Sequence, residues 1–146
     1  MYKRILVPTD GSAESRRAAN RAIALAKSMG ASVSVYYAIP PVSAALFADG
    51  MPIPAEAIET IEAESRKTGE RYLAKVAQAA QKAGVPVDTL MSKSTPAEGI
   101  VAAARKRKCD AIYIGTHGWG AVKSLLLGSV TQRVLHLAKI PVIVSR

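Results

Sequence analysis

Residues 115–131 contain the pattern in this chain that has the clearest chemical meaning. Gly115, Gly118 and Gly128 follow the spacing Gly-x2-Gly-x9-Gly, and Ser129 comes directly after the last of them. Glycines permit a positive φ and a close approach of ligand that any Cβ would hinder. Backbone N–H groups in such a loop and the positive end of a helix dipole both favour bound phosphate. The sequence therefore predicts that this segment binds a nucleotide.

A strand and a helix must position this loop. The apolar residues of the predicted strand Asp110–Ile114 are typical of a buried parallel strand. A helical pattern begins near Ser129, which we expect to be its N-cap within a capping box ending at Gln132. The Ser129 hydroxyl would then have two competing roles, as a helix cap and as a donor to phosphate.

The remaining elements alternate in the same way. We expect an N-cap at Ser12, the end of this helix at Gly30 in the left-handed backbone conformation, and a capping box from Thr95 to Glu98. Alternation with short connections predicts one α/β domain over residues 1–146, doubly wound, with a mostly parallel sheet and helices on both faces. The predicted strands are Lys3–Val7, Ser32–Ile39, Val85–Met91, Asp110–Ile114 and Val142–Ser145; the predicted helices are 13–29, Ala55–Ala83, Pro96–Lys106 and Ser129–Ala138; and Pro40–Pro54 is a long surface loop.

Ligands of such sheets bind beyond the carboxyl ends of the strands, where the strand order reverses. Asp10 follows the first strand and has two readings, a ligand contact or a cap for the next helix. His117 has no acidic neighbour in sequence to orient it, so we interpret it as a loop or ligand contact, not as a general base. Lys123 either reaches phosphate or lies in solvent.

Two well-known phosphate motifs are missing from the sequence. Nowhere does Gly-x4-Gly-Lys-Ser/Thr occur, which excludes a Walker-type P-loop. Gly118-x-Gly120 is followed by Lys123 where a dinucleotide fingerprint requires glycine, and no acidic residue lies about 20 positions downstream. The sequence therefore does not predict a dehydrogenase.

The combination of motifs resembles the ATP-binding branch of the universal stress protein family. The resemblance covers nearly the whole chain, because its segments occur in order and at the expected strand–helix junctions. These segments are Ile5-Leu6-Val7-Pro8-Thr9-Asp10-Gly11-Ser12, the capped helix after Thr95, Ile114-Gly115-Thr116-His117-Gly118, Leu127-Gly128-Ser129-Val130-Thr131 and Pro141-Val142-Ile143-Val144.

The resemblance implies a sheet in the order 3-2-1-4-5, a cleft for ATP at the carboxyl edge and a homodimer. It places Asp10 near the nucleoside, where its carboxylate would bind ribose or a phosphate-bound Mg²⁺, and it places the backbone around Ala38 near adenine. Amide and hydroxyl groups at the start of the last helix would bind phosphates. The full set implied for ATP is Pro8, Thr9, Asp10, Ala38, Gly115, Thr116, His117, Gly118, Trp119, Gly120, Ala121, Gly128, Ser129, Val130 and Thr131.

Two apolar features indicate contacts with other chains. Val142, Ile143 and Val144 would form an edge strand with unpaired backbone groups. Pairing across a two-fold axis would cover that edge, and the family's dimers are built in this way. Trp119 and the run Leu125–Leu127 predict either a lid or a surface for an unidentified protein partner.

Composition limits the remaining classes of function. The 146 residues carry a formal net charge of +9 and are 49% hydrophobic, but no apolar run approaches the length of a membrane span. The basic residues are scattered or end a helix at 105–108, without the aromatic platform of single-strand binders, so we expect neither nucleic-acid nor membrane binding. A single cysteine, Cys109, and a strand at the very start without a signal peptide predict a cytoplasmic location.

The sequence thus favours a homodimeric, ATP-binding sensor or regulator of stress adaptation. No arrangement of a base or an arginine finger is visible, so slow ATP hydrolysis is the most we expect, and no residue is assigned as catalytic. Two alternatives stay open: an interaction module on the same fold that binds no nucleotide, and a basic nucleic-acid-binding protein.

Overall fold

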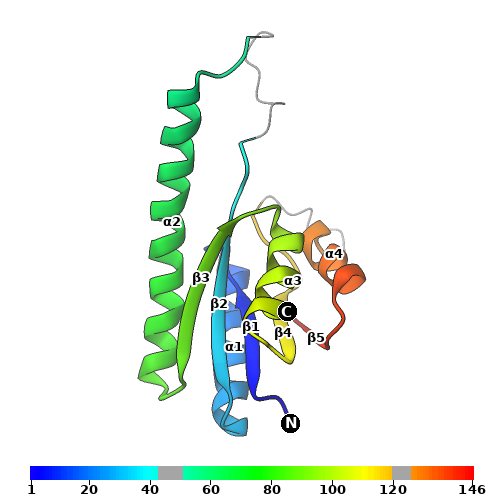
Figure 1. The fold of residues 1–146 in the computed structure, drawn as a ribbon. Coiled ribbons are helices and arrows are strands. Elements are labelled where there is room, and N and C mark those ends of the chain that lie inside the picture. The colour runs from blue at the N-terminus through cyan, green and yellow to red at the C-terminus, as the bar shows by residue number, and fades with distance from the viewer. Residues whose placement is uncertain (43–50, 120–125) are drawn as a thin grey trace.

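A parallel sheet of five strands, in the order β3-β2-β1-β4-β5, forms the centre of the molecule (Figure 1). The computed structural model describes residues 1–42, 51–119 and 126–146. Every strand pairing is parallel, which confirms the predicted fold class and strand order. The strands are β1 (Arg4–Pro8), β2 (Ser32–Ile39), β3 (Val87–Lys93), β4 (Ala111–Gly115) and β5 (Val142–Ser145), and the helices are α1 (Ala13–Met29), α2 (Ala55–Lys82), α3 (Pro96–Lys106) and α4 (Ser129–Leu137).

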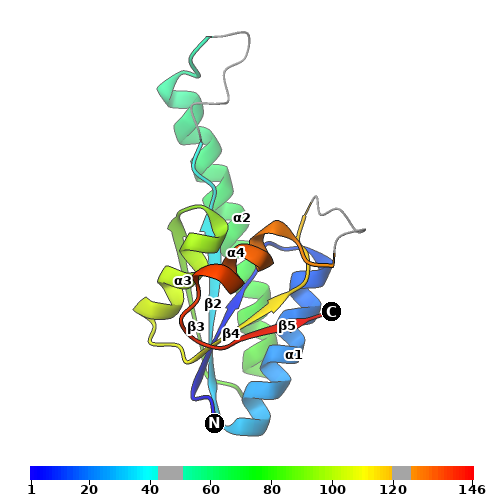
Figure 2. The same cartoon turned by 90° about the vertical axis from the view of Figure 1, so that its right-hand side faces the viewer.

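Side-chain alternation along the strands divides the core into two layers. Ile5 and Val7 of β1 face α1 and α2, whereas Leu6 between them faces α3 and α4. All three are fully buried. Figures 1 and 2 show the two helix pairs on opposite sides of the sheet. Both faces are covered, which explains why the neighbouring strands β1 and β4 are almost continuously apolar.

The largest error in the predicted boundaries is at β3, which begins at Val87 and not at Val85. Gly84 has φ +75°, and the Val85 amide donates to the Ala80 carbonyl oxygen at 2.9 Å. Val85 is therefore part of the turn that ends α2. β3 also ends two residues later than predicted, at Lys93 and not at Met91, whereas the ends of the other four strands differ from the prediction by one residue or less.

Two of the predicted helix ends are confirmed. The Ser12 hydroxyl accepts from the Ser15 amide, and Gly30 ends α1 with φ +65°. The capping box at Thr95 is only partly correct: Thr95 is the N-cap of α3, but its side chain makes no capping bond to the backbone. Its hydroxyl instead donates to the Glu98 carboxylate at 2.5 Å.

Helix α2 extends well beyond the sheet in both views (Figures 1 and 2). Its buried residues all lie in its second half, from Gly69 onward. Ile61, in the first half, is 45% exposed. Gly69 allows the helix to pack closely against β2, because a Cβ there would lie 2.2 Å from the Tyr37 ring.

Part of the predicted loop Pro40–Pro54 lies outside the described residues, since 43–50 are not among them. Within the described ranges, no helix combines the length and the apolar character needed to cross a bilayer.

Glu98 joins α3 to α4. Both Nε and Nη2 of Arg133 lie 2.9 Å from its Oε1. The Thr95 hydroxyl, then the backbone N–H of Glu98 itself and the Arg133 side chain, lower the pKa of Glu98 from 4.5 to about 2. This contact stabilises the fold fully above pH 4.5, and the contribution is lost as the pH falls toward 2.

We therefore expect Glu98→Gln to lower the melting temperature near pH 7 and to have a progressively smaller effect toward pH 3. Melting temperatures of both proteins across this range measure the effect. Glu59→Gln, on the exposed side of α2, is the control. A difference that does not change with pH would contradict the assignment.

Candidate functional site

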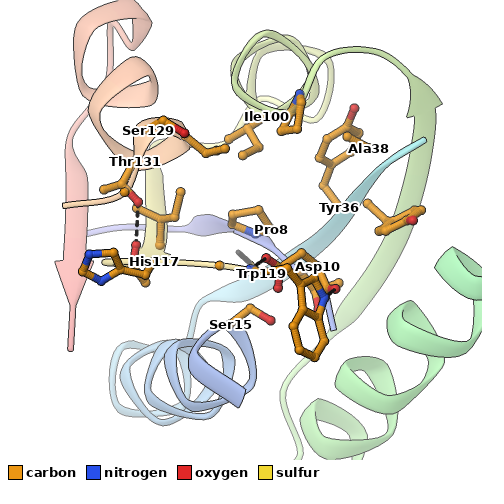
Figure 3. A pocket seen from close by; sticks show the side chains of 18 residues that line it. Pro8, Asp10, Ser15, Tyr36, Ala38, Ile100, His117, Trp119, Ser129 and Thr131 are labelled. Atoms are coloured by element: carbon orange, nitrogen blue, oxygen red, sulfur yellow. Dashed lines mark hydrogen bonds between the residues drawn. The ribbon is translucent and has the colours of Figure 1, made fainter. Parts of the chain in front are cut away.

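A cavity of about 460 Å³ opens at the carboxyl edge of the sheet. It lies where the chain leaves β1 and β4, the neighbouring central strands from which the order runs outward in both directions. Figure 3 shows residues from these strand ends, from β2 and from α3 and α4 around one space. Sheets of this kind bind ligands at the point where the strand order reverses.

Most of the residues predicted to bind ATP lie around this cavity. Thr116 is not among the lining residues, and Gly120 and Ala121 lie outside the described residues. The predicted residues that line it are Pro8, Thr9, Asp10, Ala38, Gly115, His117, Gly118, Trp119, Gly128, Ser129, Val130 and Thr131.

Six lining residues were not predicted. They belong to strands and helices whose apolar patterns read as core, so the only available signal was their position at the ends of elements that meet this edge. They are Ser15, Tyr36, Tyr37, Pro96, Ile100 and Ile114. Among them, Tyr36 is 1% exposed and its hydroxyl lies 2.7 Å from the Ser92 hydroxyl. Burial raises the pKa of Tyr36, so the phenol stays neutral.

Asp10 connects two loops across the mouth of the cavity. Its Oδ1 accepts from the Ser12 amide at 2.9 Å, and its Oδ2 accepts from the Trp119 amide at 3.2 Å. The cap of α1 is Ser12, so Asp10 supports the capped turn without being the cap itself. An ionised carboxylate has about four acceptor positions, so two remain for a ligand.

The glycines of the loop act differently from the prediction. Positive φ among the described glycines occurs at Gly11, Gly30 and Gly84, and not at Gly115, Gly118 or Gly128. The motif glycines instead allow the protein's own atoms to approach. A Cβ on Gly118 would lie 2.1 Å from Asp10 Oδ2, and a Cβ on Gly128 would lie 3.2 Å from the Thr116 carbonyl oxygen.

The predicted N-cap of α4 is wrong by one residue. Gly128 is the N-cap and Ser129 is the first helical residue, with no side-chain capping bond. Gln132 does not complete a capping box, since its side-chain amide donates to the Leu127 carbonyl oxygen at 2.9 Å. The Ser129 hydroxyl is exposed and is not used as a cap.

Helix α4 points its first turn at the cavity, where Ser129, Val130 and Thr131 line the wall. The first N–H groups of a helix have no acceptor within the helix. Together with the dipole they favour an anion at this position. The arrangement can hold a phosphate without any basic side chain.

Thr131 already uses its hydroxyl hydrogen. Its Oγ1 donates to the Gly115 carbonyl oxygen at 2.7 Å, and the residue is 3% exposed. This bond ties the start of α4 to the end of β4 (Figure 3). A role as hydroxyl donor to phosphate, as the sequence predicted, would require the bond to break.

Thr131→Val is therefore expected to lower the free energy of unfolding by about 1–2 kcal/mol, because a buried carbonyl oxygen loses its donor. Urea unfolding measures the change. Thr131→Ser, which keeps the hydroxyl, should lose less. Equal losses in the two variants would show that the methyl group matters and the hydrogen bond does not.

His117 has an acidic neighbour that the sequence order conceals. Its Nδ1 lies 3.7 Å from Oε2 of Glu14, on the first turn of α1, and 3.1 Å from the Thr116 hydroxyl. The side chain is 12% exposed. Sequence reasoning failed here because the two residues are brought together only by packing of α1 against β4.

No group of three or more His, Cys, Asp or Glu side chains suited to a metal ion occurs in the part of the chain that the structure describes. Cys109 is free and buried. Asp10 supplies the only carboxylate in the cavity wall as described. A cation bound here would need most of its ligands from elsewhere, such as phosphate oxygens and water.

Comparison with known proteins gives one consistent result. A model described as the universal stress protein family matches residues 1–146. Universal stress protein MJ0531 of Methanocaldococcus jannaschii is 41% identical over the whole of this chain and 83% of its own length. The solved structure of the hypothetical protein MJ0577 has a TM-score of 0.85 and 26% identity, covering 99% of this chain and 95% of that one. A universal stress protein solved in complex with cAMP has a TM-score of 0.73 and 25% identity, covering 99% and 97%.

Proposed function

The chain belongs to the universal stress protein family, and on that premise we propose that it binds ATP in the cavity at the carboxyl edge and acts as a homodimeric regulator of stress adaptation. The observation that carries the proposal is the convergence of the first turn of α4, the Asp10 carboxylate and the ends of β1 and β4 on one space. The cAMP complex of a similar protein supports an adenine nucleotide as the class of ligand.

In this proposal each part of the nucleotide contacts a different part of the cavity lining. Adenine lies toward the end of β2, where Tyr37 and Ala38 line the cavity. The two remaining acceptor positions of Asp10 suit the hydroxyls of a ribose. The phosphates meet the amides of residues 129–131 at the start of α4.

Magnesium would enter with the phosphates. Mg²⁺ keeps several waters and is usually bound through one or two carboxylates together with substrate phosphates. Asp10, the carboxylate of the described cavity wall, fits that requirement as the alternative to its role as an acceptor for ribose. When bound, the ion would neutralise phosphate charge, and Asp10 would orient it.

We also propose that two copies pair through β5. This strand is at the edge of the sheet, and Val142, Ile143 and Val144 are only half-buried in the single chain. Leu135 of α4 is 43% exposed. An unpaired edge with apolar side chains is stabilised when it meets its own copy across a two-fold axis.

The decisive experiment is mass spectrometry of small molecules released from the purified, denatured protein, followed by calorimetric titration with Mg-ATP, ADP, AMP and cAMP. We expect an adenine nucleotide and saturable binding. Blank titrations with all four would overturn the proposal and favour the nucleotide-free interaction module. Gel shifts with DNA and RNA at low and moderate salt test the nucleic-acid alternative, which predicts a steep loss of affinity with salt.

A further inference from the structure

Trp119 is the only tryptophan of the chain, and it is 66% exposed. An exposed indole usually leaves its N–H to water, but here both N–H groups of the residue have protein acceptors. The backbone N–H donates to Asp10 Oδ2 at 3.2 Å, and the indole Nε1–H donates to the Asp10 carbonyl oxygen. Figure 3 shows the indole lying beside Asp10 at the rim of the cavity.

The acceptor residue is itself fixed. Asp10 Oδ1 accepts from the Ser12 amide at the start of α1, so the carboxylate cannot follow a moving loop without losing this bond. Gly118 lies so close to Oδ2 that even a methyl group would not fit between them. The contact therefore joins the loop after β4 to the turn after β1 at one defined point.

The loop has a second attachment on the opposite side of the cavity. The Gly128 amide donates to the Thr116 carbonyl oxygen at 2.7 Å, and the Thr131 hydroxyl ties α4 to the end of β4. Between the two attachments lie Gly118 and His117, which line the cavity. The backbone near the predicted phosphate position is thus held at both ends.

We propose that Trp119 is a positioning residue that fastens this loop to Asp10 and thereby determines how long a bound nucleotide stays in the cavity. The inference rests on the proposed function. Holding the loop and the carboxylate in place before binding removes part of the ordering cost from the binding step. Since most of the indole is in solvent, its packing contributes little to the stability of the fold.

The test uses Trp119→Phe, which keeps an aromatic ring but loses the pyrrole part of the indole with its N–H, and Trp119→Ala, which removes the aromatic side chain altogether. Leu126→Ala is the matched control, because Leu126 is 70% exposed in the same loop and does not line the cavity. Stopped-flow release of a fluorescent ATP analogue gives the dissociation rate, and thermal unfolding gives stability.

We expect Trp119→Phe to release the analogue about five- to tenfold faster, which corresponds to one hydrogen bond, with an unchanged melting temperature. Leu126→Ala should behave as the parent protein does. Parent-like release from both Trp119 variants overturns the inference and leaves the proposed function intact. A parent protein that binds no analogue overturns both. A third readout needs no ligand: high fluorescence anisotropy of the single indole is expected, and free rotation would contradict the attachment.

Discussion

Gly99→Ala is expected to destabilise the protein by about 1–2 kcal/mol, although alanine is the better helix former by about 1 kcal/mol. Gly99 is a buried residue of α3, and a Cβ there would lie 2.1 Å from the Tyr36 hydroxyl oxygen and 2.9 Å from Cζ. Tyr36 is 1% exposed, and the cavity that it lines is the side toward which its ring could move. Forcing an extra carbon into a packed core costs about 1–3 kcal/mol, and the gain in helix propensity offsets only about 1 kcal/mol of that cost.

Tyr36→Phe provides the control for this prediction. It removes the oxygen that the new methyl group would meet, and its own cost is small because Ser92, the partner of that hydroxyl, is exposed to water. Gly99→Ala in the Tyr36→Phe background should therefore lose less than half as much stability as in the parent. Urea unfolding of the four proteins gives the coupling. If Gly99→Ala cost the same stability in both backgrounds, the added methyl group would not be meeting the Tyr36 hydroxyl.

The sequence predicts the features of this fold that depend on residues close together in the chain. Residue periodicity and capping or turn residues identify elements, since they depend on local chemistry: the caps at Ser12 and Gly30 and the presence of five strands were predicted correctly. The strand order and the candidate site came from the resemblance and from the rule that ligands bind at strand ends. Twelve of the predicted ligand residues lie around one cavity for this reason.

The contacts that the sequence did not reveal have a common physical origin. Gly69, Gly99 and Gly118 each leave room for a side chain that is distant in sequence, and no local pattern reports such a contact. The pairing of Glu14 with His117 likewise depends on helix packing. Sequence reasoning therefore found where the loop lies but was wrong to expect a positive φ at Gly115, Gly118 and Gly128, of which Gly118 and Gly128 accommodate nearby protein atoms.

The close contact between Gly118 and Asp10 leads to the second prediction with a large expected effect. Gly118→Val is expected to weaken ATP binding by at least 100-fold, or about 2.7 kcal/mol, and to leave the fold nearly as stable as the parent. The added Cβ would displace the Asp10 carboxylate, which two backbone amides hold in place. The loop would then lose its attachment to Asp10, and the ribose would lose its acceptor.

Calorimetric titration with Mg-ATP, together with urea unfolding, measures both parts of this prediction. Gly84→Ala is the control, because Gly84 lies at the end of α2 with open space around it and outside the cavity wall. It should lose some stability through its φ of +75° and no affinity. Gly128→Val should weaken binding less than Gly118→Val, since its Cβ would approach the Thr116 carbonyl oxygen to 3.2 Å, a milder contact than the one at Gly118. If Gly118→Val bound ATP as tightly as the parent, the nucleotide would have to lie away from Asp10, and the cavity at the carboxyl edge would not be its site.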